Sequence, residues 1–453
     1  MSMKTQKKAI NMVTDSPGRA LLFFALPMIL GNLFQQFYNI IDSVVVGRFV
    51  GEEALASVGA SYSITNVFIA IAVGGGIGSS VVVSQFLGAK QTGNMKTAIS
   101  TTLINFLSIG VILGGLGLLF NHRILSFMNT PENVFYDASV YLGIYFIGLP
   151  FLFMYNVQAS VFQALGDSKT PLYLLVFSSL LNVVLDLLFV TQFFMGVAGV
   201  AIATLIAQGL SAVLSFLILI KRLKEYETTE PFRLYDWNMM LHMMRVAIPS
   251  TLQQSIVHIG MLLVQSVVNG FGSAVMAGFA AGTRIESICI VPMLALGNAM
   301  STYTAQNIGA GKKDRVKVGY RYCYLMAGVF AVIICVIMET WGDLFIRSFL
   351  NEGSADTAFQ TGMSYVRFIS FFYICIGCKA TTDGLLRGAG DVAVFTVANL
   401  VNLAIRVSVA AVFAPIIGVQ AVWFAVPMGW TANYIISFIR YLTGKWERIQ
   451  LIS

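Results

Sequence analysis

The hydrophobic positions of this chain fall into about twelve long apolar runs that are separated by short polar breaks. A helix needs roughly 20 apolar residues to cross a hydrocarbon core about 30 Å thick, so each run predicts one membrane-spanning helix. The predicted spans are approximately 20–46, 54–80, 97–119, 138–163, 171–194, 197–220, 241–268, 274–300, 318–338, 360–386, 392–413 and 418–442. Only 11% of the residues are charged, against roughly 25% in soluble proteins. The pattern therefore predicts an all-α membrane protein with twelve transmembrane helices.

Short motifs of the first half recur in the second half in the same order. The recurring pairs are Ala25-Leu26-Pro27 with Ala247-Ile248-Pro249, QFLGA (85–89) with QNIGA (306–310), and Gly166-Asp167 with Gly390-Asp391. The spacing between the two members is nearly the same for all three pairs. A nearly constant spacing indicates duplication of one six-span unit. Two such halves in a membrane protein usually enclose a site that opens alternately to each side.

Lysine and arginine gather in alternate loops between the predicted spans. One set of loops holds Lys4, Lys7, Lys8, Arg19, Lys90, Lys96, Lys169, Lys221, Arg222, Lys224, Arg233, Lys312, Lys313, Arg315, Lys317, Arg387, Arg440, Lys445 and Arg448. The other set holds Arg48, Arg123 and Arg347. The positive-inside rule therefore predicts a multi-pass protein of the cell (plasma) membrane with both termini in the cytoplasm. It also explains the net charge of +7 without a nucleic-acid partner.

The domain organisation follows from the repeat and the loop charges. We expect an N-terminal six-helix lobe at 1–220, a cytoplasmic linker at 221–240 and a C-terminal six-helix lobe at 241–453. Because six is an even number, both halves enter the membrane with the same polarity, and a pseudo-symmetry axis along the membrane normal relates them. A polar N-terminus runs straight into a long first span without a small-residue cleavage site, so no signal peptide is expected.

The five cysteines, Cys289, Cys323, Cys335, Cys375 and Cys378, all lie in the second half and mostly inside apolar spans. Cys375 and Cys378 form a CxxC, but no second cysteine pair or histidine accompanies them at metal-ligand spacing. We therefore interpret the cysteines as packing residues. We expect no metal and no cofactor beyond a coupling ion.

Acidic residues at bilayer depth carry the candidate chemistry, because a charge there costs about 2.5 kcal/mol or more and needs a reason. Asp42 and Asp186 both fall in the outer half of their spans. Asn182 shares a helix face with Asp186, and Thr204 in the sixth span reaches a similar depth. Two buried carboxylates with amide and hydroxyl neighbours can hold one proton, or can cage a sodium ion with oxygen ligands. One alternative is that a buried partner neutralises each acid and both serve helix packing. Another is that Asp42 caps the outer end of its span near Arg48.

Several longer strings give a family resemblance. Residues 25–61 (ALPMILGNLFQQFYNIIDSVVVGRFVGEEALASVGAS), 163–171 (QALGDSKTP), 181–190 (LNVVLDLLFV), 305–315 (AQNIGAGKKDR) and 385–391 (LLRGAGD) resemble the multidrug and toxic compound extrusion (MATE) family. The likeness covers almost the whole chain and is similar to the DNA-damage-inducible branch. It implies two pseudo-symmetric lobes forming a V around a central cavity. It further implies export of amphiphilic, often cationic compounds in exchange for protons or sodium ions, by a monomer.

In the branch that this chain resembles, the positions of Asp42, Asn182, Asp186 and Thr204 form the cation site of the first lobe. The other large branch carries a Glu in the seventh span and an Asp in the upper tenth. Here span 241–268 offers no acid, and Asp383 stands only four residues before Arg387 at the cytoplasmic end. We therefore expect coupling to rest on the first lobe.

Residues of the substrate cavity are weaker candidates, chosen because aromatic and methionine side chains suit many flat cations. The candidates are Gln35, Phe37, Tyr38, Met154, Tyr155, Asn156, Met261, Arg284 and Met293. Pro27 removes a backbone hydrogen bond within the first span and permits a bend there.

We interpret charged residues within the spans of the second half as structural ion pairs. Glu286 and Arg406 lie in different spans and are expected to pair across helices rather than to contact substrate. Lys379 and Asp383 are four residues apart and are expected to pair with each other.

Three rival functions compete with export. A lipid-linked precursor flippase of the same superfamily needs a cationic cavity, which the acid pair opposes and Arg284 and Arg406 favour. An enzyme is not expected, because no DDxxD or HExxH string occurs and the chain has three histidines. A passive channel would not need two pseudo-symmetric lobes with a buried acid pair.

Overall fold

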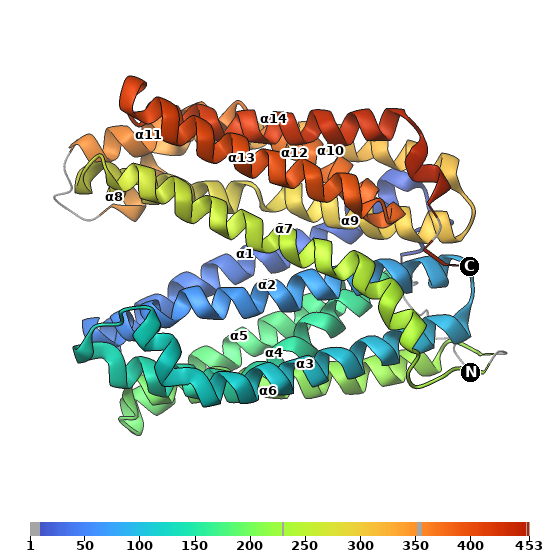
Figure 1. Ribbon diagram of the computed structural model, residues 1–453, viewed down its shortest axis with the longest axis horizontal. Coiled ribbons are helices and arrows are strands. Elements are labelled where there is room, and N and C mark those ends of the chain that lie inside the picture. Colours follow the sequence, from blue (N-terminus) through green and yellow to red (C-terminus); the bar gives the residue numbers. More distant parts are fainter. Residues whose placement is uncertain (1–9, 229–230, 351–355, 450, 453) are drawn as a thin grey trace, which may run out of the picture. The chain divides into compact units, whose positions relative to one another are not determined.

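The computed structural model describes residues 10–228, 231–350, 356–449 and 451–452, and within them every regular element is a helix. Figure 1 labels the elements where there is room. They are α1 (Pro17–Phe49), α2 (Glu52–Gly88), α3 (Thr92–Phe127), α4 (Glu132–Ala164), α5 (Lys169–Leu187), the π-helix η1 (Leu188–Gln192), α6 (Gly196–Lys224), α7 (Trp237–Asn269), α8 (Ser273–Cys289), α9 (Val291–Gly309), α10 (Lys313–Phe349), α11 (Asp356–Ser370), α12 (Tyr373–Ala389), α13 (Val392–Ile417), α14 (Gln420–Leu442) and the 3-10 helix η2 (Lys445–Arg448).

The helices confirm the predicted all-α membrane fold. In the described part of the chain, 11 helices are long and apolar enough to cross a membrane. The bent pair α11 and α12 raises the total to 12 when it counts as one span. These two helices meet at an angle of 54° after Ser370. Each observed span overlaps one of the twelve apolar runs, because in hydrocarbon a run of this length satisfies its backbone only as a helix.

The helices form two compact units. Unit 1 joins the described residues of Met1–Ile29 to those of Leu252–Ser453, and unit 2 comprises Leu30–Thr251. Two helices are divided between the units, since α1 passes from unit 1 to unit 2 and α7 passes from unit 2 to unit 1. Pro27 and Pro249 lie within these helices, each two residues before the division. Proline has no backbone N–H to donate within a helix. Each divided helix therefore lacks one backbone hydrogen bond close to the point where it passes from one unit to the other.

Glycine allows the helices of unit 2 to approach each other closely. The Gly-rich run at 110–117 of α3 favours such close packing. In this unit α4 packs against α2, α3 and α6 (Figure 1). A Cβ added at Gly114 of α3 would lie 2.6 Å from the Phe146 carbonyl oxygen of α4. Phe146 itself is fully buried, together with Leu149 and Phe153 on the same helix. One apolar core of unit 2 therefore lies along the contact between α3 and α4, and a second one joins Val46, Ala54, Val190, Val197 and Val200.

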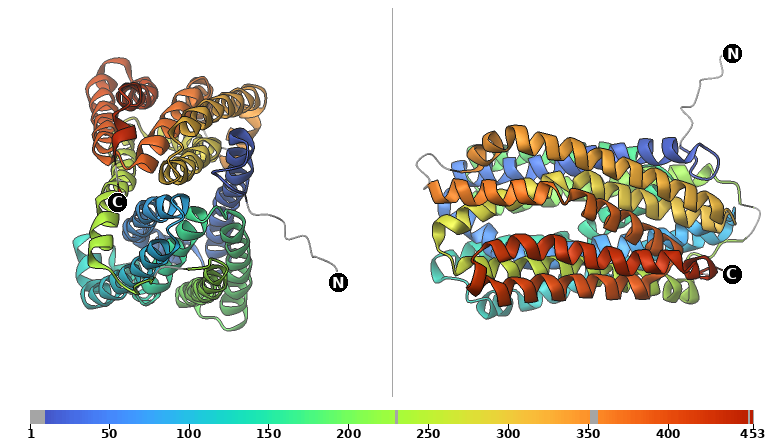
Figure 2. Two further views of the ribbon diagram at one scale, coloured as in Figure 1. Left: turned by 90° about the vertical axis from the view of Figure 1, so that its right-hand side faces the viewer. Right: turned by 90° about the horizontal axis from the view of Figure 1, so that it is seen from above.

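Unit 1 uses the same device between α9 and α12. A Cβ at Gly384 of α12 would lie 2.1 Å from the Gly297 carbonyl oxygen of α9, so the two backbones are in contact. Helix α12 also packs against α10 and α14, and Figure 2 gives an end-on view in its left panel. The absence of a Cβ atom at Gly297 and Gly384 is thus a condition of the packing.

The repeated Gly-Asp pair forms the same turn in both units. Gly166 (φ 81°) and Gly390 (φ 84°) adopt the left-handed conformation that ends α4 and α12, and glycine takes this conformation without a Cβ penalty. The following N–H groups close the turns, with Asp167 N donating to Phe162 O at 2.9 Å and Asp391 N donating to Leu386 O at 2.8 Å. This shared geometry explains why the Gly-Asp pair recurs in the second half.

The close approach of α2 and α7 gives a test of packing in unit 2. A Cβ at Gly78 would lie 2.2 Å from the Ala247 Cα, which is backbone and cannot move aside cheaply. We expect Gly78→Ala to lower the stability of the folded protein by about 1–3 kcal/mol, the usual cost of overpacking. The measurement is the midpoint of thermal unfolding in detergent. The control is Gly115→Ala on α3, where a Cβ would meet nothing within 4 Å among the described residues. Equal midpoints for both variants would contradict this contact.

Candidate functional site

Three helices of unit 2 bring together the acids and amides that the sequence singled out. Asp42 comes from α1, Asp186 from α5 and Thr204 from α6. Asp186 is 1% exposed, and Asn182, one turn before it on the same face of α5, is 2% exposed. The carboxyl groups of Asp42 and Asp186 lie close enough to interact directly. We refer to Tyr38, Asp42, Asn182, Asp186 and Thr204 as the carboxylate cluster.

Hydrogen bonds fix the neutral members of this cluster. The Tyr38 hydroxyl donates to Asn182 Oδ1. Asn182 Nδ2 donates in turn to Thr204 Oγ1 at 3.3 Å, and the Thr204 hydroxyl donates to the Val200 carbonyl oxygen at 3.0 Å. The chain of bonds links α1, α5 and α6 and leaves each neutral group with an assigned partner.

The two carboxylates, by contrast, lack donors. Neither carboxylate oxygen of Asp186 receives a hydrogen bond from an amide, amine or hydroxyl group of any residue that the structure describes, and the same holds for Asp42 Oδ1. An ionised carboxylate only accepts hydrogen bonds, so two of them cannot satisfy each other. The pair becomes complete when one proton sits between the carboxylates or when a cation binds them. The donor set therefore suits the binding of a proton or another small cation.

A helix irregularity lies directly beside Asp186, and no sequence pattern predicts it. Helix α5 passes into the π-helical turn η1 at Leu188, two residues after Asp186. The Thr191 hydroxyl donates to the Leu187 carbonyl oxygen at 2.6 Å within this turn. Turns of this type are rare and occur frequently at functional sites, because they re-aim the neighbouring side chains.

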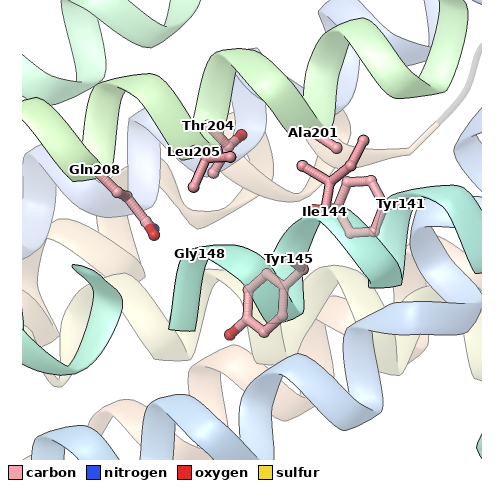
Figure 3. Close-up of a pocket in the computed structure, with 8 residues that line it drawn as sticks. All are labelled: Tyr141, Ile144, Tyr145, Gly148, Ala201, Thr204, Leu205 and Gln208. Atoms are coloured by element: carbon pink, nitrogen blue, oxygen red, sulfur yellow. The ribbon is translucent and has the colours of Figure 1, made fainter. Parts of the chain in front are cut away.

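A small cavity adjoins the cluster at Thr204 (Figure 3). Its volume of about 10 Å³ is close to what one water molecule needs. Figure 3 shows Thr204, Leu205 and Gln208 of α6 on one side and Tyr145 of α4 on the other. The remaining lining residues are Tyr141, Ile144, Gly148 and Ala201.

Tyrosines of α4 complete the surroundings of the acids. The Tyr141 side chain interacts electrostatically with both Asp42 and Asp186, and the Tyr145 hydroxyl donates to the Thr65 carbonyl oxygen at 3.2 Å. Neither tyrosine was expected from the sequence. Their spacing of four residues places them on one helix face and is the signal that could have found them.

Comparison with known proteins identifies the family of this fold. The profile of the MatE family matches residues 27–188 and 249–412, one stretch in each half of the chain. The chain belongs to the MATE family. The two matched stretches correspond to the two repeats that the recurring motifs predicted.

Relatives of known sequence cover nearly the whole chain. The probable multidrug resistance protein YpnP of Bacillus subtilis (strain 168) is 32% identical over 447 residues, which cover 98% of this chain and 99% of the relative. The FAD transporter of Shewanella oneidensis is 24% identical over 82% of this chain and 80% of that protein. These relatives therefore include proteins with different named cargoes.

Solved MATE structures share the fold. The crystal structure of MATE in complex with MaL6 superposes with a TM-score of 0.91 at 23% identity, and covers 98% of this chain and 100% of that chain. The outward-facing conformation of a multidrug resistance MATE family transporter gives a TM-score of 0.90 at 23% identity, with 99% and 100% coverage.

The candidate cavity residues of this MATE protein lie in varied surroundings. Gln35 Nε2 donates to Asn39 Oδ1 at 3.4 Å, and Asn156 Nδ2 donates to the Leu152 carbonyl oxygen at 2.8 Å. Phe37, Met261 and Arg284 are exposed, Met154 and Tyr155 are partly buried, and Met293 is fully buried. Met293 packs beside Gly377, where a Cβ would lie 3.1 Å from its sulfur. Of this set, the structure brings only Tyr38 into the carboxylate cluster.

Unit 1 holds its own buried charges. Lys379 Nζ lies 3.0 Å from Asp383 Oδ2, which confirms the expected pair, and it also donates to Asn399 Oδ1 at 3.3 Å. Glu286 accepts a hydrogen bond from the Tyr365 hydroxyl at 2.5 Å and interacts electrostatically with Arg406. The expected ion pair of Glu286 with Arg406 is not formed among the described residues, because Tyr365 supplies the hydrogen bond and Arg406 acts on Glu286 only through its charge.

The contrast between Asp186 and Asp167 gives a test of the site. Leaving a buried acceptor without a donor costs about 1–3 kcal/mol. We therefore expect Asp186→Asn to raise the midpoint of thermal unfolding at neutral pH, because it removes a buried charge and adds a donor. The identical change at Asp167 should lower the midpoint only slightly, because the Asn Oδ1 still accepts the backbone N–H groups and only the bond from the Thr170 hydroxyl to Oδ2 is lost. Asp167 caps α5 by accepting the Lys169 and Thr170 N–H groups at 3.1 Å and the Thr170 hydroxyl at 2.7 Å.

A decrease for both variants would instead support the packing interpretation of Asp186. The far-ultraviolet circular dichroism of each variant serves as the control for retained helix content.

Proposed function

We propose that this MATE protein is a secondary active multidrug efflux antiporter that exports amphiphilic, often cationic compounds in exchange for protons or sodium ions. One observation carries the proposal, namely that buried Asp186 and half-buried Asp42 lie together, with three of their four carboxylate oxygens buried and without an amide, amine or hydroxyl donor among the described residues. The family membership and the names of relatives such as the multidrug resistance protein of Bacillus subtilis support the class of cargo.

The mechanism rests on mutually exclusive states of unit 2. With the ion bound, the carboxylates attract each other through it, and α1 and α5 are held together. Without the ion, the two negative charges repel, and the cationic cargo gains an electrostatic partner. Exchange of one proton for one singly charged cation moves no net charge, so the pH gradient alone drives it. Exchange for a neutral compound moves one charge, which through 100 mV supplies about 2.3 kcal/mol, or roughly fortyfold accumulation when coupling is tight.

The hydrogen bonds favour the proton as the coupling ion. Sodium needs a cage of several oxygen ligands. Asn182 Oδ1 and Thr204 Oγ1 already accept from Tyr38 and Asn182, so the uncommitted oxygens in the cluster are those of the acids. A proton needs only two oxygens, one from each carboxylate. We therefore propose proton coupling at Asp42 and Asp186, with Asn182 and Thr204 as positioning residues.

The remaining features of the proposal follow the sequence. The protein acts as a monomer in the cell membrane with both termini in the cytoplasm, the linker 221–240 joins the lobes 1–220 and 241–453, and it catalyses no chemical reaction. It belongs to the branch that resembles the DNA-damage-inducible transporters.

A lipid-linked precursor flippase is disfavoured. Such a protein needs converging cations for a pyrophosphate. Arg284 is exposed and Arg406 is associated with Glu286, so the two arginines are placed in different surroundings.

Efflux of a fluorescent lipophilic cation from proteoliposomes tests the proposal. Under an imposed pH gradient, the native protein should transport the cation, and Asp42→Asn should reduce coupled transport at least about a hundredfold, since it removes the charge that binds the ion. The control is Asp343→Asn, which removes an exposed acid paired with Arg367 at 3.3 Å and should leave transport unchanged.

A sodium gradient applied without a pH gradient identifies the ion. Transport driven only by sodium would overturn the proton assignment and retain antiport. Uphill export by Asp42→Asn would overturn the mechanism, and no transport by the folded native protein under either gradient would favour the flippase.

A further inference from the structure

Residues 11–15, just before α1, form a turn that is closed by its own side chains. Asn11 Oδ1 accepts the N–H groups of Val13 at 2.9 Å and Thr14 at 3.0 Å. Asp15 Oδ2 accepts the Asn11 N–H at 3.0 Å, and the Asp15 N–H donates to the Asn11 carbonyl oxygen at 3.0 Å. The local N–H groups are thus used internally, and backbone carbonyl oxygens are left to face outward.

A preformed receptor for this turn lies where α9 meets α10 in the same unit. Arg315 Nε donates to Asn307 Oδ1 at 3.0 Å, and Asn307 Nδ2 donates to the Tyr303 carbonyl oxygen at 2.8 Å. The Arg315 guanidinium also lies 5.8 Å from the centre of the Tyr303 ring. These contacts orient Asn307 and Arg315 independently of the turn.

The turn docks on this receptor through its backbone. The Met12 carbonyl oxygen accepts from Asn307 Nδ2 at 3.0 Å and from Arg315 Nη2 at 3.2 Å. Arg315 Nη2 also donates to the Asp15 carbonyl oxygen at 2.5 Å, and Lys312 Nζ donates to the Val13 carbonyl oxygen at 3.2 Å. The Met12 side chain is 0% exposed. The segment is therefore held by one buried apolar side chain, Met12, and by hydrogen bonds from the charged side chains of Arg315 and Lys312. The rest of its surface is polar.

The docking continues into the first turn of α1. A Cβ at Gly18 would lie 2.9 Å from Tyr322 Cδ1 of α10, so α1 begins in close contact with unit 1. The later part of α1, including Asp42, belongs to unit 2. The turn therefore fixes to unit 1 the near end of a helix whose far end carries a coupling carboxylate.

The linker before α7 has an equivalent attachment in unit 2. Lys96 Nζ donates to the Tyr226 carbonyl oxygen at 2.7 Å, and Thr101 Oγ1 accepts the Asp236 N–H at 3.1 Å. The Thr97 hydroxyl oxygen accepts the Arg233 N–H at 3.0 Å. Both divided helices are thus preceded by a segment that docks on the unit in which the helix begins. Docking of the segment before a divided helix therefore occurs in both repeats and is not confined to the N-terminus.

We propose that residues 11–15 form a latch, which holds the start of α1 on the Asn307–Arg315 receptor in one state of the transport cycle and is released in another. The proposal rests on the proposed function, since a release needs a cycle. Most latch contacts are hydrogen bonds at partly exposed atoms, which water can replace at a small net cost. The single buried side chain, Met12, supplies an apolar contact that can also re-form. The contacts suit a reversible attachment.

Thiol labelling measures docking directly. In a background with the five native cysteines replaced by alanine and transport retained, Met12→Cys should react slowly with a membrane-impermeant maleimide in inside-out vesicles. Adding Arg315→Ala should raise the labelling rate at least about tenfold, because it removes charge-assisted hydrogen bonds to two carbonyl oxygens. The matched control is Lys313→Ala, which removes an exposed charge two residues away and should leave the rate within about twofold. Equal rates for the two variants would overturn the receptor assignment.

State dependence separates a latch from a static anchor. We expect an imposed pH gradient or a saturating lipophilic cation to change the labelling rate of Met12→Cys at least about threefold. An unchanged rate in every condition would overturn the latch. Amide hydrogen exchange of Val13 and Thr14 in the native chain, compared with Arg315→Ala, gives the same answer if Met12→Cys does not fold. Transport is measured in the same vesicles to keep the two proposals distinct. If the Arg315→Ala change alters labelling but no transport occurs, the docking of residues 11–15 on Asn307 and Arg315 is supported and the antiporter is refuted.

Discussion

The whole structure depends on the fact that hydrocarbon offers no hydrogen bonds, so a buried polar group must find its partner within the protein. In the helices, the backbone N–H and C=O groups are hydrogen-bonded to each other. Side chains meet this demand through pairs such as Lys379 with Asp383 at 3.0 Å and Arg440 with Asp391 at 2.5 Å. Asp186 departs from the rule, with two buried carboxylate oxygens that no amide, amine or hydroxyl of a described residue satisfies. A buried carboxylate with both oxygens in this condition is the feature on which our proposal of a coupling ion from solution rests.

Helix α1 connects this exception to the rest of the fold. It is a single helix from Pro17 to Phe49, and at 1.5 Å per residue the distance from Pro17 to Asp42 is roughly 38 Å. Its first part packs in the unit that contains the latch receptor, and its later part packs beside Asp186. Neutralising Asp42 and releasing the latch therefore act on opposite ends of one element. Pro27, near the division, lowers the cost of bending between those ends.

Much of the fold could be predicted from the sequence, because apolar runs of spanning length have one solution in lipid and the recurring motifs mark the duplication. The Lys379–Asp383 pair was likewise accessible, since residues four apart on a helix face each other. The division of α1 and α7 between units was not, because it depends on close contacts such as Gly78 against Ala247, which leave no periodic signal. The π-helical turn after Asp186 and the docking of residues 11–15 were also missed. Both depend on backbone geometry that many side chains permit.

The two repeats share a scaffold but differ in chemistry at equivalent positions. At the spacing that separates Gly166 from Gly390, Tyr141 corresponds to Tyr365 and Asn182 to Arg406, so the tyrosine recurs while an amide is replaced by a permanent cation. The carboxylate positions correspond to apolar residues. Ala410 matches Asp186 at this same spacing, and Val264 matches Asp42 at the spacing that separates Pro27 from Pro249.

Val264 is 1% exposed and Ala410 is 0% exposed, so both equivalents are ordinary core positions. A buried acid of the second repeat, Glu286, comes instead from α8, with the Tyr365 hydroxyl as its donor and Arg406 as an electrostatic neighbour. A carboxylate that already has a hydroxyl donor and a guanidinium nearby has little need of an ion from solution. Our proposal therefore places the coupling ion at the acids of the first repeat alone, and the difference between the two repeats gives a transporter a single coupling site.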